Sequence, residues 1–144
     1  MFDPDRNQVR QFYCSLWRKH RQGLPLDGSE TTALPIVLAH PEYHALLEAP
    51  QEALSREFTP ENGQGNPFLH LSLHLAIAEQ VAIDQPPGLR GQFERLLART
   101  GDIHPAQHAM MDCLVEMIWQ SQHYGRAYDA AAYLDCLRRQ PHPA

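Results

Sequence analysis

The sequence has no apolar run that approaches the ~20 residues needed to span a membrane. Its opening stretch, MFDPDRNQVR, lacks the apolar segment of a signal peptide, so we expect neither a membrane span nor a leader. Cysteine is scarce: Cys14, Cys113 and Cys136 are odd in number and show no CxxC spacing. We interpret all three as reduced thiols in small core positions, which indicates a cytoplasmic protein.

An excess of basic charge is also lacking, since 12 Lys and Arg face 17 Asp and Glu and the net charge is −5 with histidine neutral. This total argues against nucleic-acid binding. One basic cluster does exist at the end of the first predicted helix (Arg18, Lys19, His20 and Arg21). The helix dipole favours such residues at a helix C-terminus, so the cluster has a structural explanation.

Alternating strand patterns are absent, and between the 12 prolines and 8 glycines the apolar residues follow helical spacing. The composition is 43% hydrophobic and 20% charged, as in ordinary globular proteins. We therefore predict an all-α, single-domain helical bundle of about six or seven helices over residues 1–140, with a flexible tail over 141–144. The predicted helices are 4–22, one that begins after Ser29 and contains Leu38, 41–47, 67–83, 89–100, 105–123 and one that Asp129 caps.

Residues 67–83 are apolar on nearly every side, which predicts a helix buried on all faces. Residues 50–66 are polar and rich in turn residues, which predicts a surface loop containing at most one turn of helix.

Six of the nine histidines form pairs spaced four residues apart: His40 with His44, His70 with His74, and His104 with His108. In a helix this spacing places both rings on one face, one turn apart, where they could grip the same metal ion. Only the middle pair falls inside a predicted helix, since His40 and His104 are expected at helix caps. His70 and His74 are thus the predicted anchors, with His44 and His108 as the next ligands.

His40, His104 and Glu116 complete the candidate metal ligands. The carboxylate of Glu116 follows His104 and His108 along the same predicted helix in steps of four, through Asp112. Imidazole with carboxylate suits Zn, Fe or Ni. A site with an open coordination position would allow metal-assisted hydrolysis or oxygen chemistry, but no motif selects a substrate.

Two other interpretations remain open. The histidines could form a structural hydrogen-bond network in a non-enzymatic adaptor, whose irregular surface loops would bind a protein partner. Nucleic-acid binding through the basic end of the first helix is a third interpretation, which the acidic total weakens.

Five stretches carry a family resemblance: FDPDRNQVRQFY at the start, HPEYH from His40, NPFLHLSLHLAIAEQ from Asn66, IDQPPG from Ile83 and HAMMDCLVEMIWQSQ from His108. Together they closely resemble the bacterial domain-of-unknown-function family 1841 over nearly the whole chain. The resemblance implies a small cytoplasmic bacterial protein with a histidine-rich signature, and it implies no particular reaction. Relatives often read H-E-x-E-H where this chain has HPAQH, so Pro105 and Gln107 stand where carboxylates could have been ligands.

Overall fold

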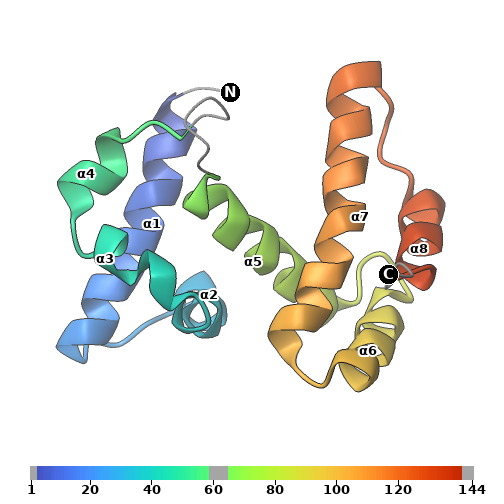
Figure 1. Cartoon of the computed structure of the whole chain (residues 1–144), viewed down its shortest axis with the longest axis horizontal. Coiled ribbons are helices and arrows are strands. Elements are labelled where there is room, and N and C mark those ends of the chain that lie inside the picture. Colours follow the sequence, from blue (N-terminus) through green and yellow to red (C-terminus); the bar gives the residue numbers. More distant parts are fainter. Residues whose placement is uncertain (1–2, 59–64, 141–144) are drawn as a thin grey trace. The chain divides into compact units, whose positions relative to one another are not determined.

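A computed structural model of the chain describes residues 3–58 and 65–140, with side chains from Arg6 onward (Figure 1). Those residues form α-helices and one short 3₁₀ helix, and no strand occurs among them, which confirms the all-α prediction. The elements are α1 (Asp3–Gln22), α2 (Ser29–Leu38), η1 (Pro41–Tyr43), α3 (His44–Leu47), α4 (Pro50–Ser55), α5 (Pro67–Ile83), α6 (Leu89–Thr100), α7 (Ile103–Tyr124) and α8 (Ala130–Arg138).

The predicted number of helices was slightly low. The described residues contain eight α-helices where six or seven were expected. The additional one is α4, which lies in the predicted surface loop and begins with Pro50 at its first position. Proline fits there because the first helical N–H needs no partner within the helix. The predicted helix over 41–47 is also two elements, η1 followed by α3.

The chain divides into two compact units, one up to Ser72 and one from Leu73 onward, and helix α5 contributes to both. We refer to them as unit 1 and unit 2. Compact packing alone does not say whether either unit folds independently, so a single domain over residues 1–140 stays a prediction. The predicted tail over 141–144 lies outside the described residues.

Unit 1 is built around α1, which packs against α2, α3 and α4. Helix α1 supplies the centre of its core, where Tyr13, Leu16 and Trp17 are buried, whereas Val9 is exposed. From the other helices the buried apolar residues are Ala33, Ile36, Val37, Leu47, Ala53, Phe68 and Leu71. The buried residues of α1 follow helical spacing and define the face that packs on the other helices.

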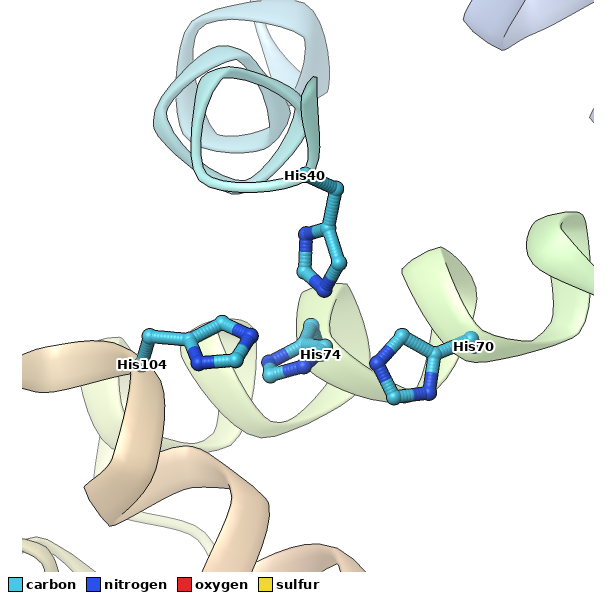
Figure 2. A group of neighbouring side chains, drawn as sticks. All are labelled: His40, His70, His74 and His104. Atoms are coloured by element: carbon cyan, nitrogen blue, oxygen red, sulfur yellow. The ribbon is translucent and has the colours of Figure 1, made fainter. Parts of the chain in front are cut away.

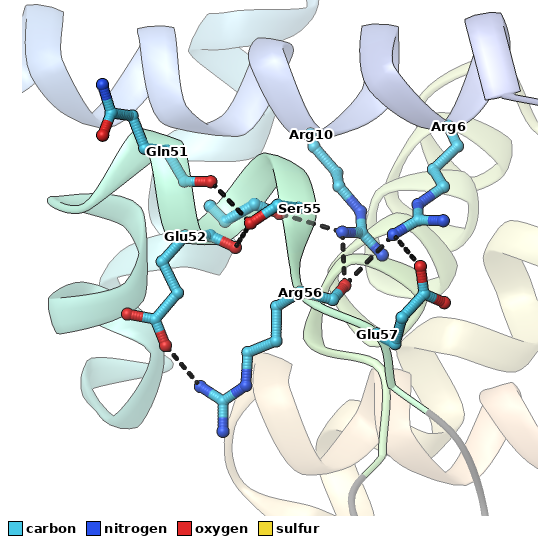
Figure 3. A network of polar contacts seen from close by, with 8 residues as sticks. Arg6, Arg10, Gln51, Glu52, Ser55, Arg56 and Glu57 are labelled. Carbon is cyan, nitrogen blue, oxygen red and sulfur yellow. Dashed lines mark hydrogen bonds and ion pairs between the residues drawn. The ribbon is translucent and has the colours of Figure 1, made fainter.

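Two arginines of α1 hold the C-terminal end of α4 (Figure 3). The Nη1 atom of the buried Arg10 donates to the backbone oxygens of Ala53 and Arg56, at 2.9 and 2.8 Å. Arg6 Nη2 donates to the same Arg56 oxygen at 3.1 Å and forms an ion pair with Glu57, also at 3.1 Å. The last carbonyls of a helix have no partner within it, so these contacts satisfy groups that the helix itself leaves open.

Unit 2 contains α6, α7 and α8, which pack against one another. Gly101 and Gly125 end α6 and α7, with φ of 85° and 62°, a left-handed conformation that glycine adopts without strain. Asp129 caps α8 as predicted, since its carboxylate accepts from the backbone N–H of Ala132. The buried core consists of Ile77, Leu89, Leu96, Ala106, Met110, Met111, Cys113, Tyr133 and Leu137.

The prediction of three reduced cysteines was wrong for two of them. Cys113 on α7 and Cys136 on α8 form a disulfide, while Cys14 is a free, buried cysteine. The two bonded residues are separated by 23 positions, so the pairing depends on how α7 and α8 pack rather than on any local motif. Three reduced thiols were one ground for expecting a cytoplasmic protein, and that ground no longer holds.

Helix α5 is buried on one face only, which corrects the prediction that it is enclosed on every side. Its first half contacts α1, where Tyr13 lies against the ring of Phe68 and shares a 3.2 Å hydrogen bond with Ser72. Its second half supplies Ile77 to the core of unit 2. Each half thus offers one face to a core, and Leu69 remains 57% exposed. Within residues 3–58 and 65–140, no helix combines the length and apolar character that crossing a membrane requires.

Candidate metal centre

Helix α5 carries His70 and His74 on successive turns, with both rings on the same side (Figure 2). The local sequence sets this register. Asn66 accepts through Oδ1 from the backbone N–H groups of Phe68 and Leu69, at 2.9 and 3.2 Å, and Pro67 occupies the first helical position. A cap and a proline together define where the helix begins, so the two histidines share one face as their spacing predicted.

In unit 1, His40 brings a second ring to His70. His40 is the residue that precedes η1, and its side chain is 2% exposed. Its ring meets the ring of His70 edge to face, with the centroids 5.0 Å apart, and a nitrogen of each lies within 4.8 Å of the other. The ring of Tyr43 lies parallel to that of His40, with the centroids 5.4 Å apart and an interplanar angle of 2°, and it meets the ring of His70 edge to face at 6.3 Å.

The orientation of His40 follows from one hydrogen bond. Its Nδ1 lies 2.7 Å from the backbone oxygen of Ile36, and since a carbonyl can only accept, Nδ1 carries the proton and donates it. In the neutral ring the lone pair is then on Nε2, the nitrogen remote from the backbone. Metal-binding histidines commonly donate their other ring N–H to a backbone carbonyl in this way.

In unit 2, His104 of α7 stacks on His74, with ring centroids 4.8 Å apart and an interplanar angle of 22°. A nitrogen of His104 lies within 4.8 Å of a nitrogen of His74. His104 was expected at a helix cap, but α7 begins one residue earlier, at Ile103, because Asp102 is the N-cap and accepts from the Ile103 N–H at 2.7 Å. His104 therefore lies inside the first turn. Pro105 lies in the same turn, where the backbone N–H groups have no partner within the helix, so the N–H that proline lacks is not needed.

His74 is completely buried, and its Nδ1 lies 2.9 Å from Oε1 of the buried Gln107. An amide oxygen accepts, so this nitrogen also carries the ring proton and the lone pair of the neutral ring is on Nε2. Sequence reasoning treated Gln107 only as the loss of a carboxylate ligand. Its contact with His74 joins positions 33 apart in the sequence, and no local spacing could have revealed it.

Each unit therefore holds one pair of neighbouring rings, His40 with His70 in unit 1 and His74 with His104 in unit 2, and helix α5 carries one member of each pair (Figure 2). A group of imidazoles of this kind could hold a metal ion. Two of the predicted pairs contribute one member each, and the middle pair contributes both.

The other candidate ligands lie outside this group. His44 donates Nε2–H to the backbone oxygen of Val37 at 2.7 Å, since a carbonyl can only accept. Its ring stacks on that of Trp17, with the centroids 4.1 Å apart. The 3₁₀ turn of η1 separates His44 from His40, so the four-residue spacing does not correspond to one turn of a regular α-helix there. The assignment of His44 as a ligand stays a prediction.

Two candidates on α7 are exposed. His108 contacts the rings of His74 and His104, with centroids 5.6 and 5.3 Å apart. Glu116 accepts a hydrogen bond from Nε2 of Gln120 at 2.8 Å. Their assignment as ligands also stays a prediction.

The basic end of α1 is largely engaged by neighbouring side chains. Lys19 forms a 2.9 Å ion pair with Glu30, and Arg21 lies 3.8 Å from the carboxylate of Glu48. These contacts give the cluster a role within unit 1, in line with the structural explanation offered by the helix dipole.

A family model described as "Domain of unknown function (DUF1841)" matches residues 5–139, which is nearly the whole chain. The protein belongs to this family, and the resemblance drawn from its sequence motifs is confirmed. No curated protein and no solved structure matches the chain. The family assignment carries no reaction with it, so a function has to be argued from the histidines themselves.

Proposed function

We propose that the protein binds one transition-metal ion through His40, His70, His74 and His104. The observation that carries this proposal is the hydrogen bonding of the two buried rings. Both His40 and His74 donate Nδ1–H to a fixed oxygen, which orients Nε2 as the coordinating atom of the neutral ring. A metal-binding imidazole usually donates its other N–H to an oxygen in this way, and the bond fixes the orientation of the ring.

The donor set limits the ion. Imidazole nitrogen suits Zn²⁺, Fe²⁺, Ni²⁺ and copper, whereas Mg²⁺ and Ca²⁺ prefer oxygen ligands. Zinc–nitrogen bonds of about 2.0–2.1 Å in a tetrahedral site set the ligand nitrogens about 3.3 Å apart. Within unit 1 a nitrogen of His40 lies within 4.8 Å of one of His70, and within unit 2 the same holds for His74 and His104, so ring movements of about 1 Å would bring each pair to the separation that a shared ion requires.

Four protein ligands fill a tetrahedral shell, and this favours a structural ion over a catalytic one. A structural ion stabilises the folded state, because it binds the folded chain and not the unfolded one. At a free metal concentration 1,000 times the dissociation constant the gain is about 4 kcal/mol.

The test is the metal content of the full-length protein, purified without a histidine tag and measured by elemental analysis. We expect one ion per chain, lost in His74→Ala and in the half-exposed His70→Ala, which disturbs packing less. His123→Ala is the matched control, since its exposed ring donates to the Trp119 oxygen and stacks on the Trp119 ring, both within its own helix. His108→Ala distinguishes the proposed four ligands from a set that includes His108, and we expect it to retain the ion.

A wild-type protein that contains no metal and gains no thermal stability from added Zn²⁺, Fe²⁺ or Ni²⁺ contradicts the proposal. The interpretation of the histidines as a structural hydrogen-bond network would then stand. Loss of metal from the His123→Ala control would equally contradict it, because that ring has no part in the group.

A further inference from the structure

We infer that Gln107 is a positioning residue of the proposed metal site, holding His74 in the tautomer that binds the ion. The inference rests on the proposed function and concerns one hydrogen bond within unit 2. The amide oxygen of Gln107 accepts Nδ1–H of His74 over 2.9 Å, and the two side chains are 6% and 0% exposed. The bond is thus shielded from competing water.

The chemistry of the pair explains what the bond achieves. A neutral imidazole carries its single proton on either nitrogen, and only the unprotonated nitrogen can bind a metal. An acceptor at Nδ1 keeps the proton there and leaves Nε2 as the donor atom. Without that acceptor the ring could carry its proton on Nε2, which would direct an N–H toward the ion.

Helix α7 supplies both a ligand and its support. His104 and Gln107 are three residues apart, which places them about one turn apart on neighbouring parts of the helix surface. His104 stacks on the ring of His74, while Gln107 accepts from the Nδ1 of that ring. A single helix therefore makes both the ring contact and the hydrogen bond to His74.

The test replaces the acceptor while keeping the length of the side chain. In Gln107→Met the oxygen is lost, and in Gln107→Glu an oxygen remains and carries a charge. Gln80→Met is the matched control, since Gln80 also accepts a hydrogen bond in unit 2, but from the Tyr133 hydroxyl of α8 at 2.7 Å. The affinity of each metal-free, full-length variant for Zn²⁺ is measured by competition with a chromophoric chelator.

Removal of the hydrogen-bond acceptor of a metal-binding histidine weakens metal binding by about 10- to 100-fold, and we expect a loss in this range for Gln107→Met. Gln107→Glu should bind at least as tightly as the wild type, and Gln80→Met should bind like the wild type. Nitrogen NMR of metal-free protein gives an independent readout. The His74 proton should sit on Nδ1 in the wild type and in Gln107→Glu, and should redistribute to Nε2 in Gln107→Met.

The outcomes separate this inference from the proposed function. If the wild type binds no Zn²⁺, both the proposed function and the role of Gln107 are wrong. If the wild type binds Zn²⁺ and Gln107→Met binds it with equal affinity and an unchanged His74 tautomer, only the positioning role is wrong. An equal loss in Gln80→Met would also overturn it, since that result traces the effect to general destabilisation. If Gln107→Met fails to fold, Gln107→Leu takes its place in the same comparison.

Discussion

Reduction of the Cys113–Cys136 disulfide should destabilise the protein by about 3 kcal/mol. The bond joins positions separated by 23 residues, and the chain-entropy relation for a loop of that size gives about 3.4 kcal/mol at 25 °C. The constraint acts mainly on the unfolded chain, which loses conformational freedom when α7 and α8 are tethered. Reduction removes the tether and leaves the packing atoms in place.

The assay is urea denaturation followed by circular dichroism, with and without a reductant. With a slope of about 1.5 kcal/mol/M, a loss of about 3 kcal/mol lowers the urea midpoint by about 2 M. Cys136→Ala removes the bond at its partly exposed end, and its midpoint should match that of the reduced wild type. Because Cys14 is a free cysteine, Cys14→Ala keeps the response to the reductant and is the matched control.

The reasoning is refuted if the oxidised and reduced wild type unfold at the same urea concentration while mass spectrometry confirms that the bond was intact before reduction. A urea midpoint of Cys136→Ala that still depends on the reductant would also refute the assignment of the effect to this disulfide. In that case a thiol other than this pair would have to carry the effect.

Two further predictions concern hydrogen bonds in the two units. Tyr133→Phe removes the donor to Gln80 and should lower the free energy of unfolding by about 1 kcal/mol in urea titrations; no change would mean that water replaces the bond. The hydrogen bond from Lys19 holds the pKa of the Glu30 carboxyl below its usual value, so its stabilising effect is present above that usual value and is lost as the pH falls through the lowered pKa. Glu30→Gln should therefore flatten the loss of stability on acidification below about pH 4.5, and an unchanged acid limb would contradict this.

The helix bounds that sequence reasoning predicted best are those with strong local signals. Helices α5 and α6 begin and end at the predicted residues, because Pro67 and Asn66 start the first and Gly101 ends the second. The start of α7 was placed two residues late. A His-Pro step looked like a helix boundary, but Asp102 is the better N-cap, and proline is tolerated in the first helical turn.

The candidate site could be predicted only in part for a similar reason. Spacing within α5 places His70 and His74 on one face, and that follows from helix geometry alone. The choice of His40 over its pair partner His44 depends on the 3₁₀ turn between them and on the packing of Trp17 against His44. Such features arise from tertiary contacts, and single-residue patterns do not encode them.

The hydrogen-bond partners were the least accessible part of the site. Gln107 had no signal that marked it, since glutamine is an uncommon ligand of transition metals and its contact spans 33 positions. The disulfide was missed because odd numbers of cysteines without close spacing do not reveal a pair on adjacent helices. In each case the missing information is which helix faces which.

The register of α5 also limits how this protein can vary in length. Each residue added to an α-helix turns everything beyond it by about 100° around the axis. A single insertion or deletion between His70 and His74 would therefore move one ring to another side of the helix, even if all four histidines of the candidate centre were kept. We therefore expect related proteins to have no insertion or deletion between these two histidines. Substitutions there keep the number of residues and so preserve the shared face.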